Sequence, residues 1–137
     1  MQDALNMRDD SVFKAASGLH GGIGGMKDVC GALLGASLML GLMYGRSPEE
    51  AADPEKKDDA KQMVSQLYKW FKKEFGSVKC RIIRTKFERE VNNGTDTRGL
   101  AEKERLAKQH AKCADLAGRT AARTAEMLWD TVDKKRE

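Results

Sequence analysis

Proline and aromatic residues are scarce in this chain of 137 residues, which contains two prolines and 6% aromatic side chains. This composition excludes a proline-rich linker, and the sequence has no internal repeat that would indicate a repeat array. The apolar fraction of 40% is that of a globular protein, although 34% of the residues are charged. The length suits a single core, so we expect residues 1–137 to form one domain.

The sequence also lacks an apolar start and an apolar segment as long as a membrane span. Residues 1–15 are polar, so they do not form a secretory signal peptide. The longest apolar segment, 29–44, has 16 residues, whereas a helix that spans a bilayer needs about 20. We expect a cytoplasmic protein with no membrane partner, in which 29–44 is a buried central helix. Its small residues at four-residue spacing, Gly31 and Gly35 among them, predict close packing of another helix.

Cysteine is sparse, and its spacing lacks the common metal-binding motifs. Cys30, Cys80 and Cys113 lie 50 and 33 residues apart, so there is no CxxC pair and no CxxCH motif for haem attachment. In a reducing compartment, scattered cysteines bind metal, react, or are buried as small apolar side chains. Spacing alone leaves these alternatives open.

Negative charge dominates the first part of the chain and positive charge the second. Residues 1–53 carry 4 basic and 7 acidic side chains, whereas residues 54–137 carry 21 basic and 14 acidic ones. A basic half can bind nucleic acid or another anionic partner. Because acidic residues are interleaved with the basic ones, the pattern is more typical of solvated helix faces, and we expect no nucleic-acid partner.

The most distinctive segment is a glycine-dense stretch at 18–25, which leads into the apolar segment that carries Cys30. A helix over about 28–45 places Cys30 in its first turn, where a helix N-terminus stabilises a thiolate or an anion. We therefore expect a lowered thiol pKa and a reactive or metal-binding cysteine. Four residues are candidates for cradling an anion or a cofactor: Gly21, Gly22, Gly24 and Gly25. A tight packing joint is an equal alternative.

Apolar periodicity and cap residues predict the other helices. A short helix ends at Gly18, and a longer one begins at an Asp-Pro pair and extends over 53–76. The longer helix has an apolar stripe at spacings of three and four, formed by Ala60, Met63, Val64, Leu67, Phe71 and Phe75. Residues 78–90 alternate like a strand but fit a helix equally well, and we favour the helix because the sequence offers no partner strand. Residues 91–99 form a polar loop, and a last helix covers about 100–133.

The last helix is predicted to turn one stripe of residues inward. This stripe includes a histidine and a cysteine spaced i, i+3, so that both can face one site. Its members are Leu106, His110, Cys113, Ala117, Ala121, Thr124 and Leu128. Since no pair of strands is evident, the sequence predicts an all-α fold, a compact bundle of four to five helices with the glycine-rich helix at its centre.

Two stretches of the sequence carry a resemblance to a known family. The first is Gly-Gly-Ile-Gly-Gly-Met-Lys-Asp-Val-Cys-Gly-Ala-Leu-Leu-Gly-Ala at 21–36, followed by Leu-Gly-Leu-Met-Tyr-Gly-Arg at 40–46. The second is Phe-Gly-Ser-Val-Lys-Cys at 75–80, and Cys113 follows it before an alanine-rich helix. Over about residues 10–130, the sequence resembles the redox-active family named for its C-GCAxxG-C-C cysteine pattern.

The resemblance implies a small helical redox protein whose cysteines bind an iron–sulfur cluster or perform thiol chemistry. Cys30, Cys80 and Cys113 match the second, third and fourth cysteines of the family pattern. A similar domain accompanies the haem part of split-Soret-type cytochromes, which favours the cluster. The implied role is that of an electron carrier or an accessory to an oxidoreductase, with a redox partner protein. The family's first cysteine lies on an upstream helix, and we expect this chain to lack that helix.

Three thiolates leave a four-thiolate cluster site incomplete. The remaining ligand is His20, His110, a water molecule or a residue of another subunit, and His20 in the glycine-rich loop has the better location of the two histidines. Two other functions stay open. One is a metal-free dithiol, which requires two cysteines with Cα atoms within about 7 Å. The other is a structural module with buried cysteines and the glycine-rich helix at a homodimer interface.

Overall fold

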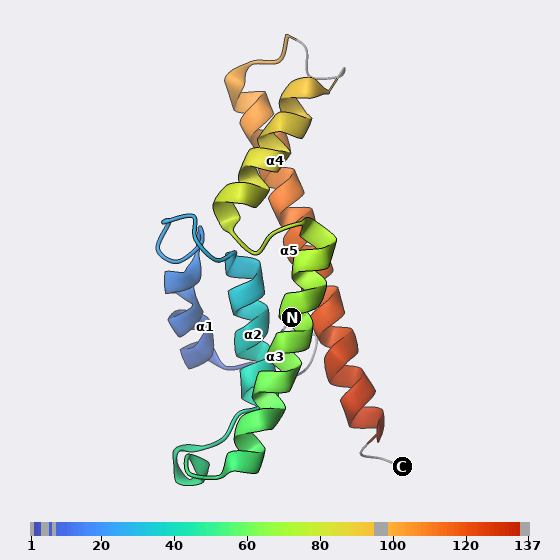
Figure 1. Cartoon of the computed structure of the whole chain (residues 1–137). Coiled ribbons are helices and arrows are strands. Elements are labelled where there is room, and N and C mark those ends of the chain that lie inside the picture. Colours follow the sequence, from blue (N-terminus) through green and yellow to red (C-terminus); the bar gives the residue numbers. More distant parts are fainter. Residues whose placement is uncertain (1, 4–5, 7, 95–98, 135–137) are drawn as a thin grey trace.

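The chain forms an all-α structure, as the sequence predicts (Figure 1). The computed structural model describes residues 2–3, 6, 8–94 and 99–134, with the side chains of 55–57 and 130–134 left out. Within these residues there are five α-helices and two short 3-10 turns, and no strand. The α-helices are α1 (Asp10–Ala16), α2 (Gly31–Tyr44), α3 (Pro54–Phe75), α4 (Cys80–Asn93) and α5 (Glu102–Lys134).

The central helix α2 packs chiefly against α3 and α5. Leu40 on α2 and Leu67 and Phe71 on α3 are completely buried, and they form one core cluster with apolar residues of α5. The apolar stripe predicted for α3 is therefore confirmed. No helix in the described part of the chain combines the length and the apolarity that crossing a membrane would need.

A backbone pairing that the sequence does not indicate sets the start of α2. Residues 28–30 are extended and form one antiparallel bridge with residues 78–80. The Cys30 and Cys80 amides each donate to a carbonyl of the opposite segment, at 2.8 and 2.6 Å. The prediction that Cys30 lies in the first helical turn is wrong, because Cys30 is the N-cap residue and α2 begins at Gly31.

Gly31 and Gly35 of α2 do not act as the sequence predicts. A Cβ atom added at Gly35 would meet no heavy atom within 4 Å, so no helix approaches closely there. A Cβ atom at Gly31 would lie 2.8 Å from the Leu19 carbonyl oxygen. The close approach therefore joins the start of α2 to the turn that follows α1, and it does not join two helices.

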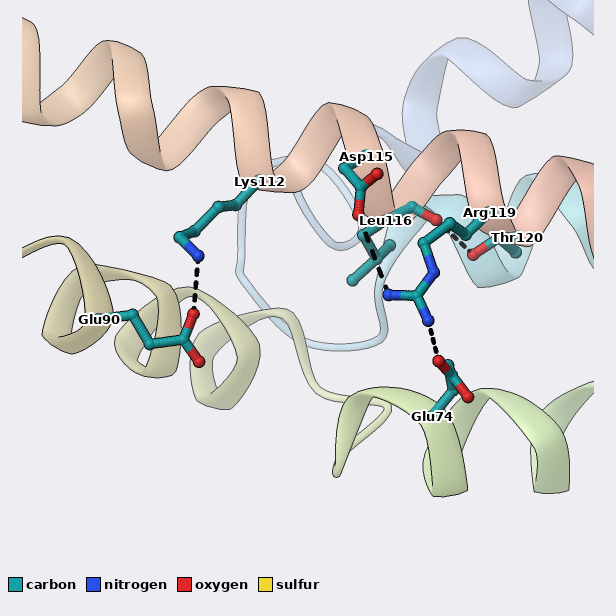
Figure 2. Close-up of polar contacts among 7 residues, drawn as sticks. All are labelled: Glu74, Glu90, Lys112, Asp115, Leu116, Arg119 and Thr120. Atoms are coloured by element: carbon teal, nitrogen blue, oxygen red, sulfur yellow. Dashed lines mark hydrogen bonds and ion pairs between the residues drawn. The ribbon is translucent and has the colours of Figure 1, made fainter. Parts of the chain in front are cut away.

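The helix α4 and the first half of α5 form a two-helix arm that extends beyond the other helices (Figure 1). Lys112 on α5 forms an ion pair with Glu90 on α4 at 2.9 Å (Figure 2). The segment predicted as a polar loop at 91–99 is helical as far as Asn93, and residues 95–98 lie outside the described part. The arm meets the rest of the bundle beside the glycine-rich turn.

The stripe predicted for α5 is wrong in this first half. Leu106 is 45% exposed and His110 is also exposed, whereas Gln109 is buried. The inward face differs because this half of α5 lies along α4 in the arm. In the second half, which lies along α3, Thr124 and Leu128 are buried as predicted.

Arg119 links α5 to the end of α3 (Figure 2). Its guanidinium forms ion pairs with Glu74 on α3 and, at 3.9 Å, with Asp115 on α5. The guanidinium carbon also lies 5.2 Å from the centre of the Phe75 ring. We expect Arg119→Ala to lower the free energy of unfolding by about 1 kcal/mol, because exposed ion pairs and cation–π contacts each contribute at most about that much.

Urea unfolding at low and at high salt tests this prediction, since salt screens the ionic part and the loss shrinks at high salt. Arg8→Ala is the matched control. The described ion pair of Arg8 joins it to Asp10, and both side chains are more than 70% exposed, at 73% and 74%. We expect no measurable loss for the control, and equal losses for the two variants would contradict the role of Arg119.

Candidate functional site

A cavity of about 540 Å³ lies where the starts of α2 and α4 meet the middle of α5. All three cysteines, Cys30, Cys80 and Cys113, line it. Both histidines of the chain, His20 and His110, line it as well. The fold thus brings every thiol and every imidazole of the sequence to one cavity, although they lie as far apart as residues 20 and 113 in the chain.

The rest of the cavity wall is apolar apart from one cation. Arg84, from the second turn of α4, is a charged lining residue, and none of the described aspartates and glutamates lines the cavity. The apolar lining comes from Ala16, Leu19, Ala32, Ile83, Leu116 and Ala117. A site without carboxylates is unsuited to hydrolysis by a pair of carboxylic acids, and its sulfur and nitrogen donors suit soft or borderline metals.

The backbone bridge between 28–30 and 78–80 positions two of the thiols. Cys30 and Cys80 occupy diagonal positions on the same side of this bridge, because side chains alternate along extended backbone. Diagonal neighbours are about 7–8 Å apart, which exceeds the usual Cα separation of about 4.4–6.8 Å in a disulfide. All three cysteines are free thiols. A disulfide between Cys30 and Cys80 would therefore require the backbone to move.

The glycine-rich turn packs directly against Cys80. Gly22 is buried and has a φ of +79°, and a Cβ atom there would lie 2.9 Å from the Cβ atom of Cys80. Gly21 and Gly22 both line the cavity, whereas Gly24 and Gly25 are exposed and do not. The structure thus brings two of the four predicted glycines to the site.

Backbone amides of the glycine-rich turn are engaged within the turn itself. The amides of residues 23–28 all donate to carbonyls of residues 18–23, at distances between 2.8 and 3.2 Å. Such amides have no hydrogen left for an anion. This part of the turn is therefore a packing joint that supports the wall of the cavity, which was one of the two alternatives from the sequence.

Cys30 differs from the reactive thiol that its position suggests. Burial raises the pKa of the Cys30 thiol, and the backbone amides of Ala32 and Leu33, which lower this pKa, offset the rise only in part. The nearby thiols of Cys80 and Cys113 raise the pKa further. The predicted lowering of this pKa is therefore wrong, because packing in the cavity removes the thiol from water and outweighs the helix N-terminus.

Cys113 has a raised pKa for the same main reason. Burial raises the pKa of this thiol, Arg84 acts in the opposite direction, and Cys80 adds to the rise. The signal for Arg84 was present in the sequence, because Arg84 lies four residues after Cys80 and so on the same face of a helix. The sequence analysis did not identify Arg84 because the residue at which α4 begins was not known.

These raised pKa values predict slow alkylation of Cys30 and Cys113 by iodoacetamide near neutral pH, because the thiolate is the nucleophile. We expect rates below that of glutathione, which rise about tenfold per pH unit between about pH 7 and pH 9 as the thiolate fraction grows. Peptide mass spectrometry after timed quenching measures each site. A rate that stays constant over this pH range would instead indicate a thiolate and a lowered pKa.

A bound metal ion needs several ligand side chains close to one point. In the described part of the chain, no three side chains of the types His, Cys, Asp and Glu are placed to hold one metal ion. A single ion requires all of its ligands within about 2.0–2.3 Å of one point. An iron–sulfur cluster binds thiolates at separate iron atoms, so its ligands stand further apart. The three thiols line one cavity without the close grouping that a single ion needs, so they fit a cluster better than a single ion.

A sequence model of one protein family matches residues 1–127 of the chain. The family is described as "Putative redox-active protein (C_GCAxxG_C_C)". The chain belongs to this family. The match confirms the family resemblance seen in the sequence, and the relation to split-Soret-type cytochromes stays a prediction. No curated protein and no solved structure matches this C_GCAxxG_C_C chain.

Proposed function

We propose that this protein is an electron carrier that holds an iron–sulfur cluster through Cys30, Cys80 and Cys113. The observation that supports the proposal most strongly is that the three thiols line one largely apolar cavity. Thiolates are the usual protein ligands of iron–sulfur clusters. Membership of a redox-active family supports electron transfer as the purpose of the site.

Other residues of the cavity would support such a site. The backbone amides of Ala32 and Leu33, at the start of α2, favour the negative charge of the Cys30 thiolate, and the Arg84 guanidinium favours that of the Cys113 thiolate. Hydrogen bonds to the sulfurs and local charge are the main means by which a protein adjusts the potential of such a centre. The bound cluster would supply one-electron transfer, while the apolar walls limit the access of water.

The free thiols and the electron-carrier role indicate where the protein acts and what kind of partner it needs. Free thiols persist in a reducing compartment, so we propose that the protein acts in the cytoplasm. An electron carrier exchanges electrons with a second protein, and we propose a redox partner protein or an oxidoreductase in that role.

Anaerobic reconstitution with ferrous iron and sulfide tests the proposal. We expect iron and acid-labile sulfide in a fixed ratio to the chain, and a visible absorption that dithionite bleaches. The control is the same chain with all three thiols alkylated after unfolding, which should bind neither. A chain that retains no iron and no sulfide under strictly anaerobic conditions would overturn the cluster assignment.

A further inference from the structure

The cavity holds fewer thiols than an iron–sulfur cluster has positions for protein ligands. Clusters of the common types are held by four protein ligands, and in some of them histidine replaces cysteine. Beyond its three thiols, the cavity is lined by two further side chains that can bind iron, His20 and His110. Among the residues that the structure describes, no carboxylate lines it.

We infer that the imidazole of His110 is the fourth protein ligand of the cluster, an inference that rests on the proposed function. His110 lies three residues before Cys113 on α5, and side chains at this spacing stand on one helix face with Cβ atoms about 5–6 Å apart. Both residues line the cavity. Ligands on adjacent positions of one helix face suit two iron atoms of the same cluster.

The imidazole of His110 is available for this role. In the described part of the chain, its ring has no hydrogen bond and no ion pair that would have to be broken. The residue is exposed and lines the cavity, so coordination would break no buried contact of the ring. An unprotonated ring nitrogen is a borderline ligand that suits iron.

His20 is the weaker of the two candidates, in contrast to the ranking from the sequence. It lies at the end of the 3-10 turn Ser17–Leu19, in the connection that leads to α2. Its carbonyl accepts a hydrogen bond from the Gly25 amide, which holds the backbone of the turn but leaves the side chain on a loop. Side chains on helices are held in more precise positions than side chains on loops, which favours His110.

Nitrogen coordination has a direct spectroscopic signature, which pulsed electron paramagnetic resonance detects on the dithionite-reduced, reconstituted full-length protein. The protein is grown with ¹⁵N-histidine and purified without a histidine tag, so that His20 and His110 are its only labelled residues. We expect a strong ¹⁵N coupling in the wild-type protein. His20→Ala should retain the coupling, whereas His110→Ala should lose it.

The outcomes separate the inference from the proposed function. A cluster without a strong ¹⁵N coupling, or a coupling that His20→Ala removes, would overturn the role of His110 and leave the thiol site intact. Failure of the wild-type protein to take up any cluster would overturn both. If His110→Ala does not bind a cluster, His20→Ala still decides the question, because His110 is then the only histidine in the chain.

A second variant tests the ligand exchange itself. His110→Cys should restore an all-cysteine site, remove the ¹⁵N coupling and shift the reduction potential downward, because replacing cysteine by histidine raises the potential of iron–sulfur centres. An unchanged potential and an unchanged spectrum in His110→Cys would contradict coordination by residue 110.

Discussion

Replacing Gly22 with alanine is expected to lower the free energy of unfolding by about 3 kcal/mol and to disturb the cysteine cavity. The φ of +79° at Gly22 costs a residue with a Cβ atom about 1–3 kcal/mol. The added Cβ atom would also lie 2.9 Å from the Asp28 nitrogen and 2.9 Å from the Cys80 Cβ atom. Overpacking of this kind typically costs about 1–3 kcal/mol more, because backbone cannot move aside cheaply.

Gly24→Ala is the matched control for this variant. Gly24 has a φ of +55°, but a Cβ atom there would meet nothing within 4 Å. Only the backbone cost remains, so we expect a loss of about 1 kcal/mol. Urea unfolding followed by far-UV circular dichroism measures both variants. Equal losses would show that contact between the glycine-rich turn and Cys80 contributes nothing to stability.

Local signals in the sequence were sufficient to predict most of the helices. The helix α3 begins at Pro54 and ends at Phe75 because a cap, a proline and a following glycine all act within a few residues of its ends. Its inward stripe follows from spacing alone, since the apolar residues from Met63 to Phe75 face one core cluster. Features of this kind can be predicted without knowledge of the rest of the chain.

The start of α2 was predicted wrongly because its cause is distant in the sequence. Residues 28–30 pair with residues 78–80, and this pairing keeps Cys30 extended. The prediction of a lowered pKa for the Cys30 thiol is wrong for a related reason. A helix N-terminus is a local feature, whereas the burial that raises the pKa comes from packing of α4 and α5 around the cavity.

The candidate site itself was only partly predictable. Family resemblance identified Cys30, Cys80 and Cys113 as a set, and the structure places them on one cavity. The inward face of α5 depends on the position of α4, so periodicity assigned Leu106 and His110 to the core although both are exposed. His110 nevertheless lines the cavity, although its side chain is exposed.

Replacement of any one of the three cysteines by serine is expected to abolish stable binding of the cluster. Changes in residues that only support a metal ligand typically cost about 10–100-fold in affinity, so loss of a thiolate ligand should cost at least about 100-fold. The fold should persist, because serine has a similar size and each cysteine is only partly buried. Iron retained per chain after competition with a chelator measures the loss, and circular dichroism measures the fold.

Ala117→Ser is the matched control for Cys113→Ser, because it adds a hydroxyl to the same cavity wall one turn further along α5 and removes no ligand. It should retain iron at the wild-type level. Since burial raises the pKa of Cys30 and Cys113, binding must displace their protons, and iron uptake by the wild-type protein should increase as pH rises toward the thiol pKa. Undiminished iron retention in all three variants would exclude thiolate coordination at this cavity.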